Sequence, residues 1–279
     1  MSLLIHRNPP FLRRRANSAA AITVENVKAA ANRLETVLFE DLPEWLQDNE
    51  HIRSGYRRPM NSTLACVRSC AMLHNETLNI YTHLIPAAAL AIFQVYIQIK
   101  ITQYFPEAST LDRIVIGANV IAAIVTFGLS ASYHTLNSHS PQISSLWLRI
   151  DYVGILTLIL GSFFSGIYVG FYCLPTPRTI HWCMITTLSF GTALLVLHPK
   201  LQEHKYRALK AYAFVATALT GFAPIGHGLY LYGWHEMWIR SGMPYYLLEG
   251  VIYGAGATVF ITRFPESIWP GHSHGTTNT

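Results

Sequence analysis

Six apolar stretches divide most of this chain, and they limit what it can fold into. They cover residues 84–101, 114–134, 151–172, 180–197, 211–231 and 245–262. About 20 predominantly apolar residues are needed to cross the ~30 Å hydrocarbon core of a bilayer. Only 13% of the residues are charged, whereas soluble proteins contain about 25%. Because a chain in lipid must satisfy its own backbone hydrogen bonds, these stretches predict an all-α integral membrane bundle with six transmembrane helices.

Basic residues are distributed unequally between the two ends of these stretches. With the N-terminus in the cytoplasm, ten Lys and Arg residues flank the spans inside: Arg53, Arg57, Arg58, Arg68, Arg149, Lys200, Lys205, Arg207, Lys210 and Arg263. Four flank them outside: Lys100, Arg113, Arg178 and Arg240. The positive-inside rule favours this orientation, and an even number of spans then places both chain ends in the cytoplasm. Since loop placement explains the excess of 20 basic over 15 acidic residues, no nucleic-acid partner is required.

The regions outside the spans divide the chain further. Residues 1–40 form a basic segment that contains three consecutive arginines. We interpret it as a disordered cytosolic tail against an anionic membrane, with a mitochondrial presequence as the alternative. Residues 41–83 are expected to form a cytosolic interfacial helical segment, in which Arg57 and Arg58 could reach lipid phosphates. The transmembrane bundle then occupies 84–262, and a short tail follows at 263–279.

Ionisable side chains near the spans are the first candidates for a functional site, because such groups are costly at membrane depth. Glu76, Asn79 and His83 follow one another at i, i+3 and i+7, which places them on one face of a helix. A solvated cytosolic face is the alternative interpretation of this stripe.

A second group combines a serine, a histidine and an aspartate at the ends of neighbouring spans. Ser130 and His134 are four residues apart and share a helix face. Asp151 opens the third span after a short loop, so it is expected in the same membrane layer as His134. A metal ligand with a carboxylate behind it is one interpretation. The alternatives are a hydrogen bond from His134 to a backbone carbonyl and an ion pair of Asp151 with Arg149. A serine-hydrolase triad is not supported, since no Gly-x-Ser-x-Gly motif surrounds the serine.

Four cysteines are too few for a disulfide scaffold. Cys173 and Cys183 flank an outer loop, where we favour two free thiols over a bridge. The segment TGFAPIGHGLYLYG, residues 220–233, predicts an interrupted helix of the kind that lines sites in transporters. We expect His227 within it to make an ordinary interhelical hydrogen bond. Because the sequence shows no internal repeat and no second interrupted helix at a matching position, a transporter or channel is the lowest-ranked function.

Several motifs, in order, resemble those of the progestin and adiponectin receptor family, which is also called haemolysin III-related. They are DLPEWLQDNEHIRSGYR, NETLNIYTH, SASYHTLNSHS with DYVGI, and RFPESIWPG, between residues 41 and 271. The likeness is strongest to fungal members associated with zinc homeostasis. It implies a seven-helix bundle with a cytosolic N-terminus, and a zinc ion near the cytosolic face.

The resemblance also implies roles for particular residues. His134 matches the family's first zinc-binding histidine, Asp151 the aspartate that holds the zinc-bound water, and Ser130 the serine beside it. Glu76, Asn79 and His83 match a first motif whose role the resemblance does not assign. Zinc with three protein ligands and one water is the catalytic type of site. The implied activity is a ceramidase-like hydrolysis of an amide bond in a sphingolipid, with membrane lipid as the partner.

The chain departs from the family pattern after residue 271. The family continues with Ser-His-x-x-x-His and a seventh apolar span, whereas this sequence reads HSHGTTNT. We therefore expect the seventh helix to be lacking, with His274 or His272 as tentative replacement ligands and a weakened zinc site. Two hypotheses remain. The protein is a receptor or hydrolase-like protein in lipid and zinc homeostasis, or a catalytically impaired partner that forms homo- or hetero-oligomers with relatives. Plasma and internal membranes are both compatible with the sequence.

Overall fold

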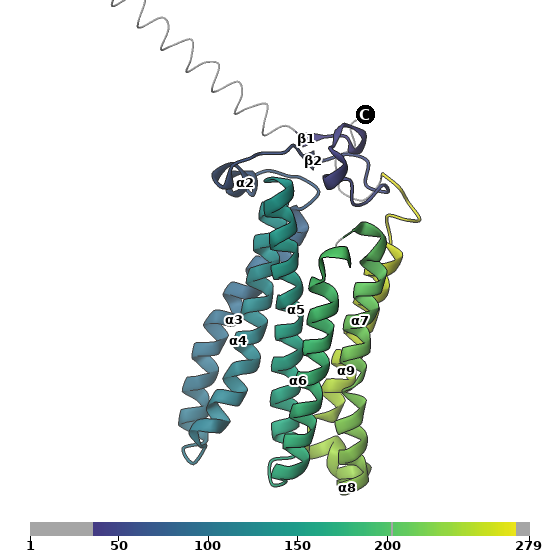
Figure 1. Cartoon of the computed structure of the whole chain (residues 1–279). Helices are drawn as coiled ribbons and strands as arrows, with labels where there is room; N and C mark the ends of the chain where they lie inside the picture. The colour runs from purple at the N-terminus through teal and green to yellow at the C-terminus, as the bar shows by residue number, and fades with distance from the viewer. Residues whose placement is uncertain (1–35, 202, 272–279) are drawn as a thin grey trace, which may run out of the picture.

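The computed structural model describes residues 36–201 and 203–271. Long α-helices run alongside one another, and a small cap of irregular chain covers one end of them (Figure 1). The long helices are α3 (Thr77–Tyr104), α4 (Thr110–Leu136), α5 (Pro141–Gly170), α6 (Pro175–Leu197), α7 (Arg207–Leu219), α8 (Phe222–Arg240) and α9 (Met243–Thr262). The cap contains strands β1 (Thr36–Val37) and β2 (Tyr56–Arg57), helix α2 (Thr63–Ser69), and short 3-10 turns at Phe39–Asp41 and Glu44–Leu46.

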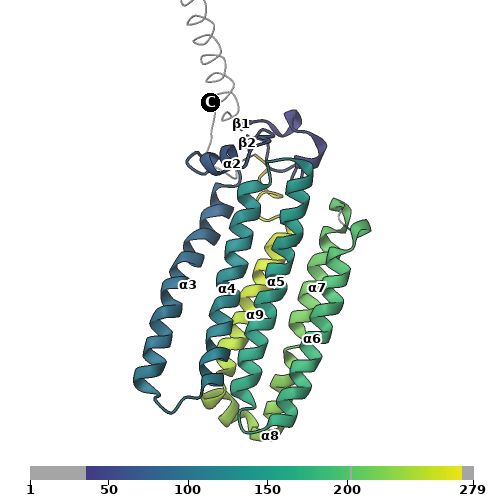
Figure 2. The same cartoon turned by 60° about the vertical axis from the view of Figure 1, so that its left-hand side comes forward.

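The prediction of an all-α membrane bundle is confirmed. Four single helices, α3 to α6, and the segment Arg207–Ile239 that joins α7 to α8 are long and apolar enough to cross a membrane. The sixth expected span corresponds to α9, which has 20 residues and returns along α7 and α8 (Figure 2). It is not among the five segments that meet the length and hydropathy criteria, so six crossings stay a prediction.

Local sequence signals set the start of α4 and α5. Ser109 and Asp112 form a reciprocal capping box at the start of α4, which satisfies two backbone N–H groups that have no partner within the helix. At the start of α5, the Ser140 side chain accepts a hydrogen bond from the Ile143 N–H, and Pro141 follows at the first helical position. Consequently α5 begins ten residues before Asp151, which lies almost three turns inside the helix rather than at its start.

Helices α4 and α5 approach each other closely along small residues. The Thr126 hydroxyl donates to the Gly154 carbonyl oxygen at 2.7 Å. Further along, a Cβ atom added to Gly161 would lie 2.5 Å from the Ala122 Cβ, so only glycine fits there without movement. This contact fixes the register between the two helices.

The interrupted helix expected in residues 220–233 is present. Helix α7 ends at Leu219 and α8 begins at Phe222, and Gly233 has φ 77°, which bends α8. His227 Nδ1 lies 3.0 Å from His181 Nε2 of α6, so the expected interhelical hydrogen bond is confirmed. Cys173 and Cys183 are both free and exposed, as expected.

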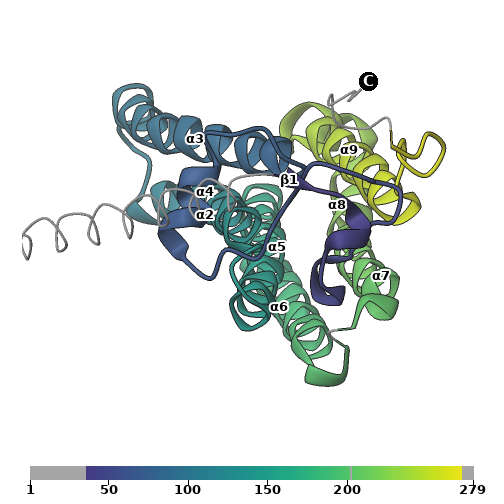
Figure 3. The same cartoon turned by 90° about the horizontal axis from the view of Figure 1, so that it is seen from above.

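The cap runs across one end of the bundle and ties distant helices together (Figure 3). Arg207 donates to Asp48 Oδ2 at 3.2 Å, and Arg263, just after α9, donates to the Asp48 carbonyl oxygen at 2.6 Å. The Gly271 N–H donates to the His51 carbonyl oxygen at 2.9 Å. The cap, which precedes α3, and the residues that follow α9 therefore lie at the same end of the bundle.

Candidate functional site

The candidate site lies where the start of α3 meets the end of α4, beneath the cap. His134 Nδ1 is 2.8 Å from Glu76 Oε2. Both side chains are largely shielded, with 19% of His134 and 15% of Glu76 exposed. Glu76 immediately precedes α3, and His134 is in the last turn of α4. The two motifs predicted separately from the sequence therefore form one site.

Glu76 is held by several donors at once. Asn79 donates to Oε2 at 2.7 Å, and the Asn137 amide donates to Oε1 at 2.8 Å. Burial raises the pKa of Glu76, but the charge and hydrogen bonds of His134, Asn79 and Arg57 outweigh it and lower the pKa to about 2. Glu76 is thus a carboxylate at neutral pH. The alternative of a solvated stripe is wrong for Glu76.

His83 extends the site one turn further along α3. Its ring stacks on that of His134, with centroids 5.7 Å apart and planes at 3°. Its Nδ1 lies 2.6 Å from the Asn79 carbonyl oxygen. Each of the two histidines therefore has Nδ1 occupied by an oxygen atom, which leaves Nε2 for another partner.

Ser130 lies one turn before His134 on α4, and Asp151 lies on the neighbouring helix α5. The Asp151 carboxylate interacts with the Ser130 side chain and, electrostatically, with His134 and His83. The close contact of Thr126 with Gly154, one turn away on each helix, places these two residues opposite each other. The alternative ion pair with Arg149 is not formed among the described side chains.

Arg57 of the cap is a site residue whose role the sequence did not reveal. It is only 4% exposed, so the expectation that it contacts lipid phosphates is wrong. Its guanidinium donates to the backbone oxygens of His134 at 2.6 Å and Thr135 at 3.0 Å. It also donates to Asn137 Oδ1 at 2.6 Å and Ser69 Oγ at 2.9 Å.

These four bonds place a positive charge at the C-terminal end of α4, where the helix dipole favours it. Burial lowers the pKa of Arg57, while Glu76 raises it. The guanidinium remains charged at neutral pH because the ordinary pKa of arginine lies far above neutral pH. Neighbouring Arg58 is exposed. The sequence shows two adjacent arginines, Arg57 and Arg58, and adjacency does not tell a buried arginine from an exposed one.

The described residues around His134 fit part of a zinc site. A metal-binding histidine usually donates its other N–H to a carboxylate, which fixes the ring and its tautomer, and Glu76 stands in that position towards His134. However, no group of three His, Cys, Asp or Glu side chains with metal-site geometry occurs within residues 36–201 and 203–271. His272 and His274, the tentative further ligands, lie outside the described residues.

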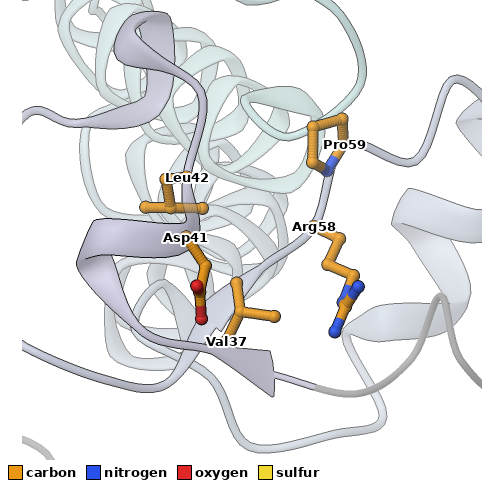
Figure 4. A pocket seen from close by; sticks show the side chains of 5 residues that line it. All are labelled: Val37, Asp41, Leu42, Arg58 and Pro59. Atoms are coloured by element: carbon orange, nitrogen blue, oxygen red, sulfur yellow. The ribbon is translucent and has the colours of Figure 1, made fainter.

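A surface pocket in the cap is separate from this site. Its lining consists of Val37, Asp41, Leu42, Arg58 and Pro59 (Figure 4). None of the predicted site residues is among them, so the pocket adds nothing to the chemistry around His134.

Residues 71–278 match the family described as haemolysin-III related. The chain belongs to this family. It is a multi-pass integral membrane protein of the adiponectin-receptor-like type, as the resemblance of its motifs implied. The matched region contains Glu76, Ser130, His134 and Asp151.

Individual members of the haemolysin-III related family match over most of this chain. The ADIPOR-like receptor IZH2 of Saccharomyces cerevisiae is 36% identical over 290 residues, which cover 98% of this chain and 89% of that protein. The ADIPOR-like receptor IZH1 of Eremothecium gossypii is 35% identical over 266 residues, or 93% of this chain and 83% of that protein. The adiponectin receptor protein of Drosophila melanogaster is 36% identical over 84% of this chain. The chain spans about half the length of that animal protein, 52%.

Proposed function

We propose that this protein is a receptor or hydrolase-like protein that binds zinc through His134 and acts on an amide bond of a membrane sphingolipid. The observation that supports it most is the 2.8 Å contact between His134 Nδ1 and Glu76. Asp151, which interacts electrostatically with the same histidine, supports it further. Zinc, when bound, supplies Lewis acidity for amide hydrolysis. His272 and His274 are the proposed further ligands.

The protein's own residues divide the remaining work. Glu76 accepts a hydrogen bond from His134 Nδ1–H, so the Nε2 lone pair is directed away from Glu76 and is available to a ligand. Asp151 is the proposed acceptor for a proton from the attacking water. Ser130, one turn before His134 on α4, is the proposed hydrogen-bond donor that orients the Asp151 carboxylate.

Hydrolysis of a short-chain ceramide by purified, zinc-supplemented protein tests this proposal. Removing a general base usually lowers the rate by about 10²–10⁴-fold, so we expect a loss of this size for Asp151→Asn. Asp41→Asn, which changes an exposed acid of the cap, is the matched control and should retain full activity. Equal rates for the two variants would contradict the role of Asp151.

The second candidate is a non-catalytic partner that associates with relatives of its family or with further copies of itself. It is favoured by the lack of a three-ligand group within the described residues. Under this alternative, purified protein lacks stoichiometric zinc and ceramide hydrolysis, yet co-purifies with a co-expressed relative. Zinc-dependent hydrolysis by the purified chain alone would rule it out.

A further inference from the structure

A second polar group lies far from His134, between α5 and α9. Ser162 of α5 donates to Glu249 Oε1 of α9 at 3.1 Å. Tyr253, one turn further along α9, interacts with the same carboxylate. Ser162 follows Asp151 by eleven residues, which is about 16 Å along a helix. The group is therefore separate from the candidate zinc site.

Helix α9 is the predicted sixth span, and an uncompensated charge at the position of Glu249 in such a span is costly. Glu249 is six residues from the start of α9 at Met243, or about 9 Å along the helix axis, and an acid at such a depth usually has a partner. Among the described side chains, none of the basic residues forms an ion pair with Glu249. Hydroxyl groups satisfy its hydrogen bonds in part but carry no charge.

The face of α9 beside Glu249 is open, because Gly250 and Gly254 are exposed. Helix α9 packs chiefly on α7 and α8, and it reaches α5 through Glu249 and through Tyr246, whose ring lies against Gly166. Beside Glu249, a Cβ added to Gly250 or to Gly254 would meet no atom within 4 Å. Tyr246 and Tyr253 lie about one turn before and one turn after the acid on the same helix.

We propose that Glu249 binds the ammonium group of a single-chain amphiphile that enters from the membrane. The carboxylate supplies the opposite charge, the Ser162 oxygen a further acceptor, and the two tyrosine rings supply faces that attract cations. A hard inorganic cation fits poorly, because Ca²⁺ and Mg²⁺ take six or more oxygen ligands. An amphiphile can place its ammonium here while its chain stays in lipid.

Binding of dodecylamine to the purified protein in nanodiscs, with dodecanol as the uncharged counterpart, tests this site. We expect the wild type to bind the amine at least tenfold more tightly than the alcohol. Glu249→Gln, which keeps the shape of the side chain, should reduce amine affinity at least tenfold and leave alcohol affinity unchanged. Glu107→Gln, which changes an exposed acid near the same end of the bundle, is the matched control and should bind like the wild type.

Labelling of the unmodified protein covers the case in which Glu249→Gln does not fold. An apolar carbodiimide reacts with carboxyl groups in the membrane interior, and mass spectrometry then locates the modified residue. We expect dodecylamine, but not dodecanol, to protect Glu249.

Equal binding of amine and alcohol, or equal protection by both, would overturn the proposal and leave Glu249 as a polar group that joins α5 to α9. Zinc content and ceramide hydrolysis report on the His134 site instead, so failure of one proposal is distinguishable from failure of the other.

Discussion

Replacing Glu76 by glutamine isolates what the carboxylate contributes to the site. Glu76 accepts three short hydrogen bonds: from His134 at 2.8 Å, Asn79 at 2.7 Å and Asn137 at 2.8 Å. Glutamine has one amide oxygen and one NH₂ group, so one side of this arrangement must place two donors against each other. If the oxygen faces His134, the NH₂ faces the Asn137 amide, and the reverse orientation sets it against the His134 N–H.

Either orientation weakens the hold on the His134 ring. Loss of a carboxylate that orients a metal-binding histidine typically lowers metal affinity about 10–100-fold, which corresponds to about 1.4–2.8 kcal/mol. Since the pKa of Glu76 is held at about 2, the wild-type carboxylate stays charged above pH 4. The loss in the glutamine variant should therefore be nearly constant between pH 6 and 8, apart from titration of the histidines themselves.

Competition for zinc with a chromophoric chelator in detergent micelles measures this difference. Glu44→Gln alters an exposed acid of the cap and is the matched control. An affinity for Glu76→Gln within twofold of the wild type, with His134→Ala binding no zinc, would refute the idea that Glu76 orients this histidine.

Three further predictions concern stability. Arg57→Met removes a buried guanidinium and leaves its backbone acceptors at the end of α4 without donors. We expect the free energy of unfolding in dodecyl sulfate to fall by about 3 kcal/mol. Arg58→Met, at an exposed position, is the control and should leave the free energy of unfolding unchanged. Gly161→Ala forces α4 and α5 apart and should cost about 1–3 kcal/mol, whereas Gly128→Ala, which meets no atom within 4 Å, should cost nothing; equal effects would contradict the close packing. Burial and Arg57 lower the pKa of His74 from 6.5 to about 4, so its neutral form is favoured in the folded state. Stability is then full above pH 6.5 and falls by up to about 3 kcal/mol as the pH drops towards 4; His74→Gln should flatten this part of the unfolding curve, and an unchanged curve would refute the assignment.

The bundle was predictable because its signals are local. Long apolar runs, the serine caps before α4 and α5, and the glycine-containing break after α7 can each be read within a short window of sequence. The helix ends were less predictable, since α5 continues for almost three turns beyond the apolar run on its N-terminal side. Capping by Ser140 and Pro141, rather than hydrophobicity, decides where that helix begins.

The site was predictable in its members but not in its connections. Spacing placed Glu76 on one helix face, and it placed Ser130 beside His134, but nothing local showed that Glu76 and His134 touch across 58 residues. Burial of Arg57 depends on the path of the cap over the end of α4, which is a tertiary feature. The same local sequence can therefore place an arginine at the membrane interface or, as for Arg57, in a buried position that holds the site together.

The zinc content of the purified protein tests the central claim most directly. His134→Ala removes the proposed ligand, and His139→Ala removes a histidine of the neighbouring loop, which instead contacts Ser140. After dialysis against a weak chelator, elemental analysis should find stoichiometric zinc in the wild type and in His139→Ala, and little in His134→Ala. Equal zinc in all three proteins, or none in the wild type, would contradict the account of His134 as a metal ligand.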